Sequence, residues 1–175
     1  KQGEWHRLFT YGIVHADYTH LIFNMFTLYF FGPEIERVFK SVLGQTSGSI
    51  FFIVLYLSAL FISITPTYFK KKDNASYYSL GASGAVSAII FAYVLINPMN
   101  YMGVLFIPIM LPAFLFGLIF ILISVSLDKK QAGGINHSAH ITGGIYGIIY
   151  MIAIFFVFAD INLINSFISQ IKINS

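Results

Sequence analysis

A serine and a histidine, the side chains of many hydrolytic sites, lie far apart in the sequence, each in a glycine-containing motif. Ser83 belongs to Leu80-Gly81-Ala82-Ser83-Gly84-Ala85, where a loop is predicted to turn into a helix and to offer backbone N–H groups to an anion. His140 belongs to Ala139-His140-Ile141-Thr142-Gly143-Gly144. A serine hydroxyl becomes a good nucleophile only when a base takes its proton, and histidine is the usual base. The two motifs therefore predict acyl transfer if the fold brings them together.

A third polar cluster contains the groups that such a reaction needs for its oxyanion. His20 and Asn24 are four residues apart and share one face of a predicted helix, and His15 lies in the approach to that helix. With the backbone N–H of Ser83, His20 and Asn24 are suitable donors to a tetrahedral intermediate. We find no third-residue carboxylate for a triad in the predicted spans, so we predict a Ser–His dyad.

Each cluster, taken alone, also has a structural explanation. His20 and Asn24 could form a hydrogen-bonded helix contact, and the glycines around Ser83 could form a small-residue packing surface. Gly143 and Gly147 leave one helix face nearly free of side chains, so another helix can approach closely there. If that helix starts at Ser83, the serine and the histidine meet at the same depth. The joint pattern is far more specific than its parts.

The elements that position these residues must be membrane helices. The chain has 175 residues, of which 57% are hydrophobic and only 10% charged, whereas a soluble domain carries about a quarter charged residues. This composition excludes an ordinary soluble domain and a disordered chain. The net charge of +3 comes from scattered residues without a basic stripe, which argues against a nucleic-acid partner. The absence of cysteine excludes disulfides and cysteine zinc sites.

The charge-free runs predict an all-α, polytopic transmembrane bundle over residues 1–159. A span needs roughly 20 mostly apolar residues in helical conformation. Five such helices are predicted, at residues 19–37, 48–66, 82–97, 103–126 and 138–159. Pro108 and Pro112 lie inside the fourth and are expected to bend it. The tail, residues 160–175, is expected to be either a short amphipathic helix on the membrane or a frayed end.

The ordered set of motifs resembles the rhomboid family of intramembrane serine proteases. The matching stretches are Trp5-His6-Arg7, His15-x4-His20-x3-Asn24, Gly32-Pro33-x2-Glu36, Gly81-Ala82-Ser83-Gly84 and Ala139-His140-x2-Gly143-x3-Gly147. The family core has six spanning helices, so the resemblance implies that the first would lie before Lys1. It implies no cofactor and no metal.

The resemblance also implies a role for each matching residue. Ser83 would be the nucleophile, His140 the general base, and His20 and Asn24 the oxyanion donors. Structural positions near the site would be His15, Gly81, Gly84, Gly143 and Gly147, with Glu36 organising helix ends. The Trp5 element receives no catalytic role. Some members carry a tyrosine under the histidine where this chain has Ser87, so another residue must support the His140 ring.

The implied function is hydrolysis of peptide bonds in or near the transmembrane segments of other membrane proteins. The partners would be such substrates and membrane lipids, and the location a multi-pass position in the plasma membrane of a bacterium. Substrates would enter laterally past residues 103–126 and reach a hydrophilic cavity, whose expected rim residues are Ser79, Asn136, His137 and Ser138. Two alternatives are a catalytically inactive relative that binds transmembrane helices and a small transporter with histidines on an ion path.

The charge of two loops disagrees with the implied topology. The resemblance places loops 66–80 and 128–137 on the outer side of the membrane. These loops carry Lys70, Lys71, Lys72, Lys129 and Lys130, whereas basic residues usually lie on the inner side.

Overall fold

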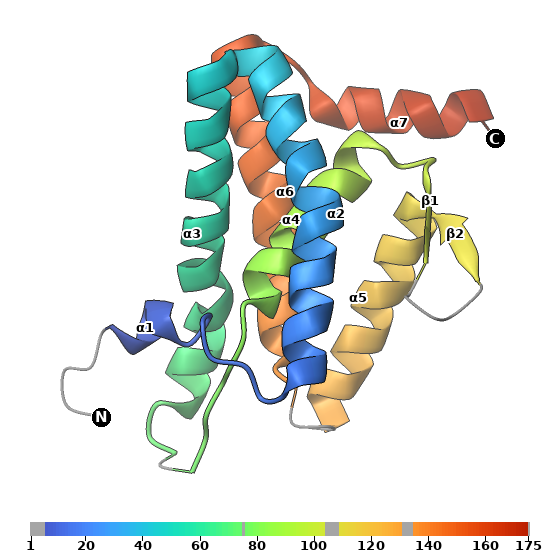
Figure 1. Ribbon diagram of the computed structural model, residues 1–175. Coiled ribbons are helices and arrows are strands. Elements are labelled where there is room, and N and C mark those ends of the chain that lie inside the picture. The colour runs from blue at the N-terminus through green and yellow to red at the C-terminus, as the bar shows by residue number, and fades with distance from the viewer. Residues whose placement is uncertain (1–5, 75, 104–108, 131–134, 175) are drawn as a thin grey trace.

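The computed structural model describes residues 6–74, 76–103, 109–130 and 135–174 (Figure 1). Its helices are α1 (Arg7–Thr10), α2 (Tyr18–Leu43), α3 (Gln45–Lys71), α4 (Ser83–Ile96), α5 (Ala113–Lys130), α6 (His137–Ala159) and α7 (Leu163–Asn174). Two short strands, β1 (Tyr101–Gly103) and β2 (Met110–Pro112), pair antiparallel between α4 and α5. The fold is a helical bundle, as predicted.

Helix α4 forms the centre of the bundle and packs against α2, α3, α5 and α6 (Figure 1). Ten of its fourteen residues are buried. Many of them are small, so neighbouring backbones can approach closely, as is common where helices pack within membranes. At 1.5 Å per residue α4 is only about 21 Å long, shorter than the roughly 30 Å hydrocarbon core of a bilayer. Its ends therefore lie inside the bundle rather than at both membrane surfaces.

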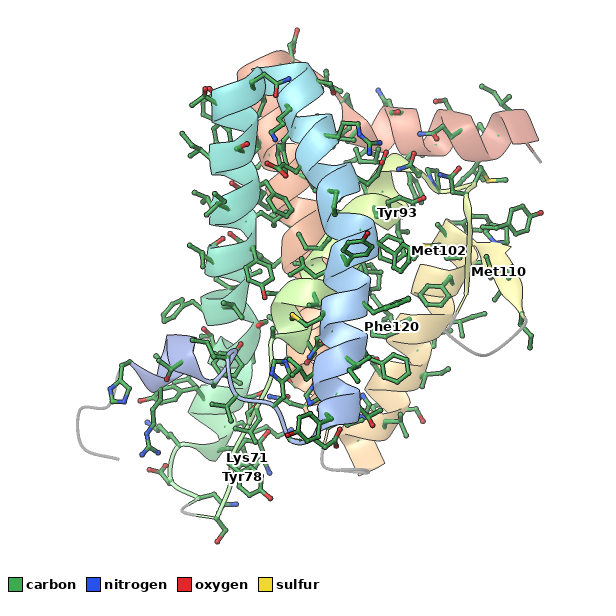
Figure 2. All side chains as sticks on the ribbon, in the orientation of Figure 1. Lys71, Tyr78, Tyr93, Met102, Met110 and Phe120 are labelled. Carbon is green, nitrogen blue, oxygen red and sulfur yellow. The ribbon has the colours of Figure 1, made fainter. Side chains whose placement is uncertain are left out.

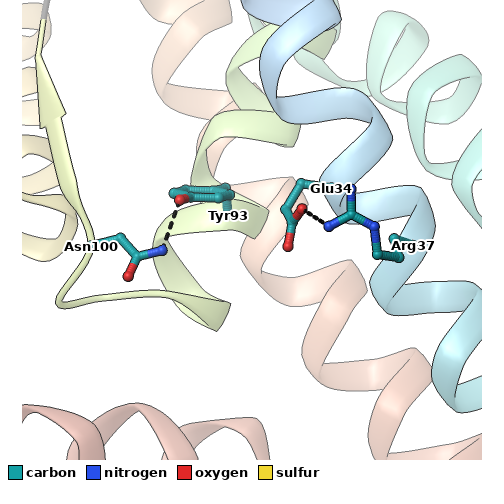
Figure 3. Close-up of polar contacts among 4 residues, drawn as sticks. All are labelled: Glu34, Arg37, Tyr93 and Asn100. Atoms are coloured by element: carbon teal, nitrogen blue, oxygen red, sulfur yellow. Dashed lines mark hydrogen bonds and ion pairs between the residues drawn. The ribbon is translucent and has the colours of Figure 1, made fainter.

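Two helices of the described residues, α3 and α6, are long and apolar enough to cross a membrane by themselves. Large apolar side chains such as Ile53 and Leu57 of α3 and Ile149 of α6 are exposed on the outside of the bundle. Lipid would cover them, since a soluble protein seldom leaves so much contiguous apolar surface exposed. Helix α2 is also long, but its second half carries charged residues, among them the ion pair between Glu34 and Arg37 (Figure 3).

The prediction of a helix over residues 103–126 is wrong at Gly103 and at residues 109–112. Helix α5 begins at Ala113, and Pro112 lies in β2, where it faces Tyr101. Pro112 therefore bends no helix, and Pro108 lies outside the described residues. A proline lacks the backbone N–H that a helix interior needs, which favours a helix that starts after it. Composition alone could not separate this apolar hairpin from a helix.

Contacts at both ends hold the hairpin on the bundle. The Asn100 side-chain amide donates to the Tyr93 hydroxyl of α4 at 2.9 Å, and the Ala113 N–H donates to the Asn100 carbonyl at 2.8 Å (Figure 3). Met102 of β1 is buried against Val94 and Ala113 (Figure 2). The hairpin thus links α5 to the central helix.

The tail forms a helix, the first of the two expectations for residues 160–175. Helix α7 extends sideways from the end of the bundle that lies opposite α1 (Figure 1). Leu163 is buried in the core, whereas Ile164 and Ile168 are exposed. The Gln170 side-chain amide donates to the Ile96 carbonyl at the end of α4, at 3.1 Å. Contact of α7 with the membrane stays a prediction.

Candidate active site

The two motifs that carry a serine and a histidine meet inside the bundle. Ser83 is the first residue of α4, and His140 lies in the first turn of α6. The distance between Ser83 Oγ and His140 Nε2 is 2.7 Å, which is a hydrogen bond. Both residues are half-buried. The arrangement therefore has the geometry of a nucleophile beside a general base.

Glycines bring these two helices close enough for the contact. A Cβ added at Gly143 of α6 would lie 2.0 Å from the Gly84 carbonyl oxygen of α4, and one at Gly147 would lie 2.3 Å from the Ala88 carbonyl oxygen. These distances are far below van der Waals contact, so no side chain fits at either position. The glycine face of α6 thus packs directly on the backbone of α4.

The turn before Ser83 is fixed by another glycine. Gly81 has a φ of 100°, which favours glycine, and its N–H donates to the Tyr11 carbonyl at 2.9 Å. A Cβ at Gly81 would lie 2.5 Å from the His20 ring, so the imidazole rests against this turn. His15 meets His20 edge-on, with ring centroids 5.2 Å apart. The structure therefore gathers His15, His20 and the turn before Ser83 at one place.

Asn24 is buried in α2, one turn after His20. Its side-chain nitrogen has no hydrogen-bond partner among the described residues; the same holds for His15 Nε2 and His137 Nδ1. A buried amide without a partner is costly, and such groups in native proteins call for an explanation. A donor kept for a developing negative charge would supply one.

Sequence reasoning missed the residue that supports the His140 ring. Phe120 of α5 stacks on it, with ring centroids 6.1 Å apart and an interplanar angle of 26° (Figure 2). Ser87, which stands where the family resemblance implies a tyrosine in some members, is buried within α4. No spacing rule marks Phe120, because it is one of 19 phenylalanines in the chain and lies in an otherwise apolar helix.

The expected rim residues have different surroundings. Asn136 caps α6: its side-chain oxygen accepts from the Ala139 N–H at 3.1 Å and from the Thr67 hydroxyl at 3.0 Å, and its nitrogen donates to Ser79 at 3.0 Å. His137 is buried and Ser138 half-buried. A cavity of about 490 Å³ borders Ser79 but is not lined by Ser83 or His140. The expectation of a cavity around the dyad itself stays a prediction.

Glu36 lies toward the other end of α2 and joins it to α3. Its carboxylate accepts from the Ser49 hydroxyl of α3 at 2.8 Å and pairs with Lys40 at 2.8 Å. These contacts fit a structural role. Trp5 lies outside the described residues.

Comparison with known proteins identifies the class of protein that this site belongs to. The family model of the Rhomboid domain matches residues 2–159. The chain belongs to the rhomboid family, which includes serine proteases, and it is a multi-pass membrane protein. No solved structure matches the chain significantly.

Individual relatives come from plants, bacteria and animals. The chain is 31% identical to the mitochondrial RHOMBOID-like protein 12 of Arabidopsis thaliana over 82% of its own length and 44% of the relative. It is 34% identical to YdcA of Bacillus subtilis (strain 168), named as a candidate rhomboid protease, over 52% of its own length and 41% of the relative. It is 31% identical to the mitochondrial presenilin-associated rhomboid-like protein of Rattus norvegicus over 78% of its own length and 35% of the relative. The chain thus spans less than half the length of these relatives.

Proposed function

We propose that the protein is an intramembrane serine endopeptidase that hydrolyses peptide bonds in or near the transmembrane segments of other membrane proteins. The observation that carries this proposal is the 2.7 Å contact between Ser83 Oγ and His140 Nε2. A nucleophile and a base in direct contact, each on a different helix of the bundle, are what acyl transfer requires. The relative named as a candidate rhomboid protease supports the same reaction class.

In the proposed reaction, His140 Nε2 takes the Ser83 proton while Oγ attacks the substrate carbonyl. The proton then passes to the leaving amine, and an acyl-enzyme remains. His140 next takes a proton from water, which attacks the ester, and returns that proton to Ser83 Oγ as the new carboxyl end leaves. This sequence requires a neutral His140 with its proton on Nδ1, so that Nε2 can accept.

The oxyanion of each tetrahedral intermediate needs donors that are already in place. The backbone N–H of Ser83, at the start of α4, has no acceptor within its own helix. Asn24 contributes a buried amide nitrogen that has no partner among the described residues. The His20 ring lies against the turn that leads to Ser83. We assign these three groups to the oxyanion site.

The proposed site lies deeper in the bundle than the C-terminal end of α3. Ser63 of α3 contacts Gly84, the residue after Ser83, and α3 continues for eight more residues to Lys71. At 1.5 Å per residue this extension is about 12 Å long. A reaction at this depth would act on a chain segment within the membrane, and the segment must be extended because a helix hides its carbonyls.

The route of substrate entry is proposed to pass α5, as expected from the sequence. The backbones of α2 and α5 do not pack against each other in the described part of the chain, although both flank α4. Lateral entry between them would lead a substrate toward the start of α4. For the location we propose the plasma membrane of a bacterium; one of the three relatives above is bacterial and two are named mitochondrial.

The decisive experiment combines cleavage of a reporter transmembrane substrate in liposomes with labelling by a fluorophosphonate. Ser83→Ala should abolish both cleavage and labelling and leave the fold intact. The matched control, Ser87→Ala, changes a buried serine one turn further along α4 and should keep both. Wild-type turnover by the Ser83 variant would contradict the assignment of the nucleophile. A folded wild type that neither cleaves nor takes the label would support the alternative, an inactive relative that binds transmembrane helices.

A further inference from the structure

A cavity of about 490 Å³ lies on the same end of the bundle as Ser83, but apart from the dyad. It is formed by the segment around α1, the last two turns of α3 and the loop that leads to Ser83. Its polar lining includes Arg7, Thr10, Lys71, Lys72, Tyr77 and Tyr78. Figure 2 shows Lys71, the last residue of α3, and Tyr78, in the loop that leads to Ser83, at the same end of the bundle. Cavities of this size commonly hold small molecules.

The cavity is strongly cationic. Three of its lining residues are basic, Arg7, Lys71 and Lys72, and none of the described lining residues is acidic. Two acidic residues lie nearby: Asp73 stands in the sequence between the lining residues Lys72 and Asn74, and the charge of Asp128 reaches Tyr77. Together with burial, which is the larger cause, Asp128 raises the pKa of the Tyr77 phenol. A hydrogen bond with the Ser79 side chain opposes this shift, so the Tyr77 hydroxyl already has a partner at the edge of the cavity. Cations and donors without carboxylates favour a phosphate.

Lys71 is already oriented toward the cavity. Its ammonium lies 5.7 Å from the centroid of the Tyr77 ring, a cation–π contact. Side chains ordered before binding reduce the entropy lost when a ligand arrives. The site is thus partly preorganised.

The lining also contains apolar side chains. These are Leu8, Val14, Ile64 and Leu80, and the cavity lies at the end of α3, one of two described helices able to cross a membrane by itself. Basic residues at such a helix end lie at the level of lipid headgroups, with their aliphatic stems along apolar surface. A ligand here would place a charged group among the lysines and an apolar part along α3.

We propose that this cavity binds the phosphate headgroup of an anionic membrane phospholipid. A free phosphate offers the same charge but has nothing to place against Val14 and Ile64. The proposal also accounts for Lys71 and Lys72, two of the lysines that conflict with the usual charge distribution of membrane loops: in this chain they line a binding site.

Residues of the cavity wall also hold the dyad in place. The Tyr11 hydroxyl donates to the Leu60 carbonyl at 2.6 Å, and the Tyr11 carbonyl accepts from the Gly81 N–H at 2.9 Å. Thr67 donates to Asn136, the cap of the helix that carries His140. A bound lipid that orders this wall would stabilise both helix starts. Its expected effect on cleavage rests on the proposed function, whereas its effect on stability does not.

The test measures thermal unfolding of the purified 175-residue chain in detergent while phosphatidylglycerol or phosphatidylcholine is added. The test variant is Lys71→Gln with Lys72→Gln. The matched control is Lys70→Gln with Lys129→Gln, which removes the same charge from the same end of the bundle but outside the cavity lining. Wild type and control should gain roughly 5 °C or more in Tm at a hundredfold excess of phosphatidylglycerol over its Kd. The test variant should gain much less, and phosphatidylcholine should have little effect on any of them.

Several results would overturn the proposal. An equal gain for the test variant and the control would show that the cavity does not bind the lipid. The same gain with inorganic phosphate alone would replace the lipid by a free anion. If the test variant differs from wild type only in cleaving reporters with an acidic flanking segment, the cavity serves the substrate instead. Lys72→Gln alone replaces the double variant if that fails to fold. A protein without any cleavage activity would still give the stability result, so the two proposals can fail separately.

Discussion

Asn24 differs from the exposed polar side chains of α2 because its amide nitrogen is buried and lacks a partner in the described part of the chain. If this nitrogen serves the oxyanion, Asn24→Ala should lower kcat by roughly 10²–10³. The Tm should not fall, since the variant removes a polar group that the fold leaves unsatisfied. Reporter cleavage and thermal unfolding, measured on the same preparation, check both parts. Thr27→Val, at a half-buried position of the same helix, should change neither.

If both the Tm and the cleavage activity fall in the Asn24 variant, the result favours the structural explanation, in which Asn24 forms a hydrogen-bonded helix contact.

Phe120 is the side chain that packs on the His140 ring from α5. Aromatic pairs contribute about 0.5–1.5 kcal/mol beyond burial, so Phe120→Leu should lower kcat by about 2–10-fold with little change in KM. Phe120→Tyr keeps the ring and should restore most of the activity. Phe116→Leu, one turn away on α5, serves as control. The rate of fluorophosphonate labelling at Ser83 should follow kcat, and an unchanged rate in Phe120→Leu would exclude the positioning role.

At the scale of single residues, the polar side chains of the site could be predicted from the sequence, but the side chain that packs on the His140 ring could not. Ser83, His140, His20 and Asn24 could be selected because their types are unusual in an apolar chain and their spacing is regular. Phe120 could not, because its role depends on how α5 lies against α6. The roles of Asn136 and Tyr11 also depend on contacts between distant segments.

Among the elements, α4 and α6 make the contact on which the dyad depends. Gly143→Ala would place a methyl group 2.0 Å from a backbone oxygen, which cannot rotate away, so the helices must separate. We expect a loss of about 1–3 kcal/mol in stability and a larger loss of cleavage. Gly117→Ala in α5 is the control, because its Cβ would meet only side-chain atoms at 3.3 Å or more.

Thermal unfolding and reporter cleavage again provide the measurements. Wild-type values for both in Gly143→Ala would mean that the close approach of α4 and α6 is not required.

Charge-free runs and glycine spacing predicted the elements well where helices are continuous. Helices α2, α3, α4 and α6 coincide with predicted segments, with ends that differ by up to six residues. The failure at Gly103 and residues 109–112 has a physical cause: apolar strands and an apolar helix have the same composition, and only Pro108, Pro112 and the turn at Asn97 distinguish them. A proline such as Pro112 is consistent both with a kink inside a helix and with a helix start just after it.

For the whole molecule, composition was sufficient to predict a membrane bundle, because too few charged residues exist to cover a surface in water. The arrangement with α4 in the centre could not be predicted in the same way. Because every spanning helix is apolar, hydropathy does not show which helix is buried at the centre of the bundle and which ones face lipid. The small residues of α4 were visible in the sequence, yet which neighbours they pack against follows from the complete fold.

The offset between Ser83 and the end of α3 has a consequence for substrates. An extended chain advances about 3.3 Å per residue, so about four residues are needed to cover 12 Å. A bond closer than this to the Lys71 level would reach the serine only if its chain moved deeper. The bundle would then select scissile bonds by their distance from the headgroups as well as by their side chains. The offset between the start of α4 and the end of α3 would set that distance.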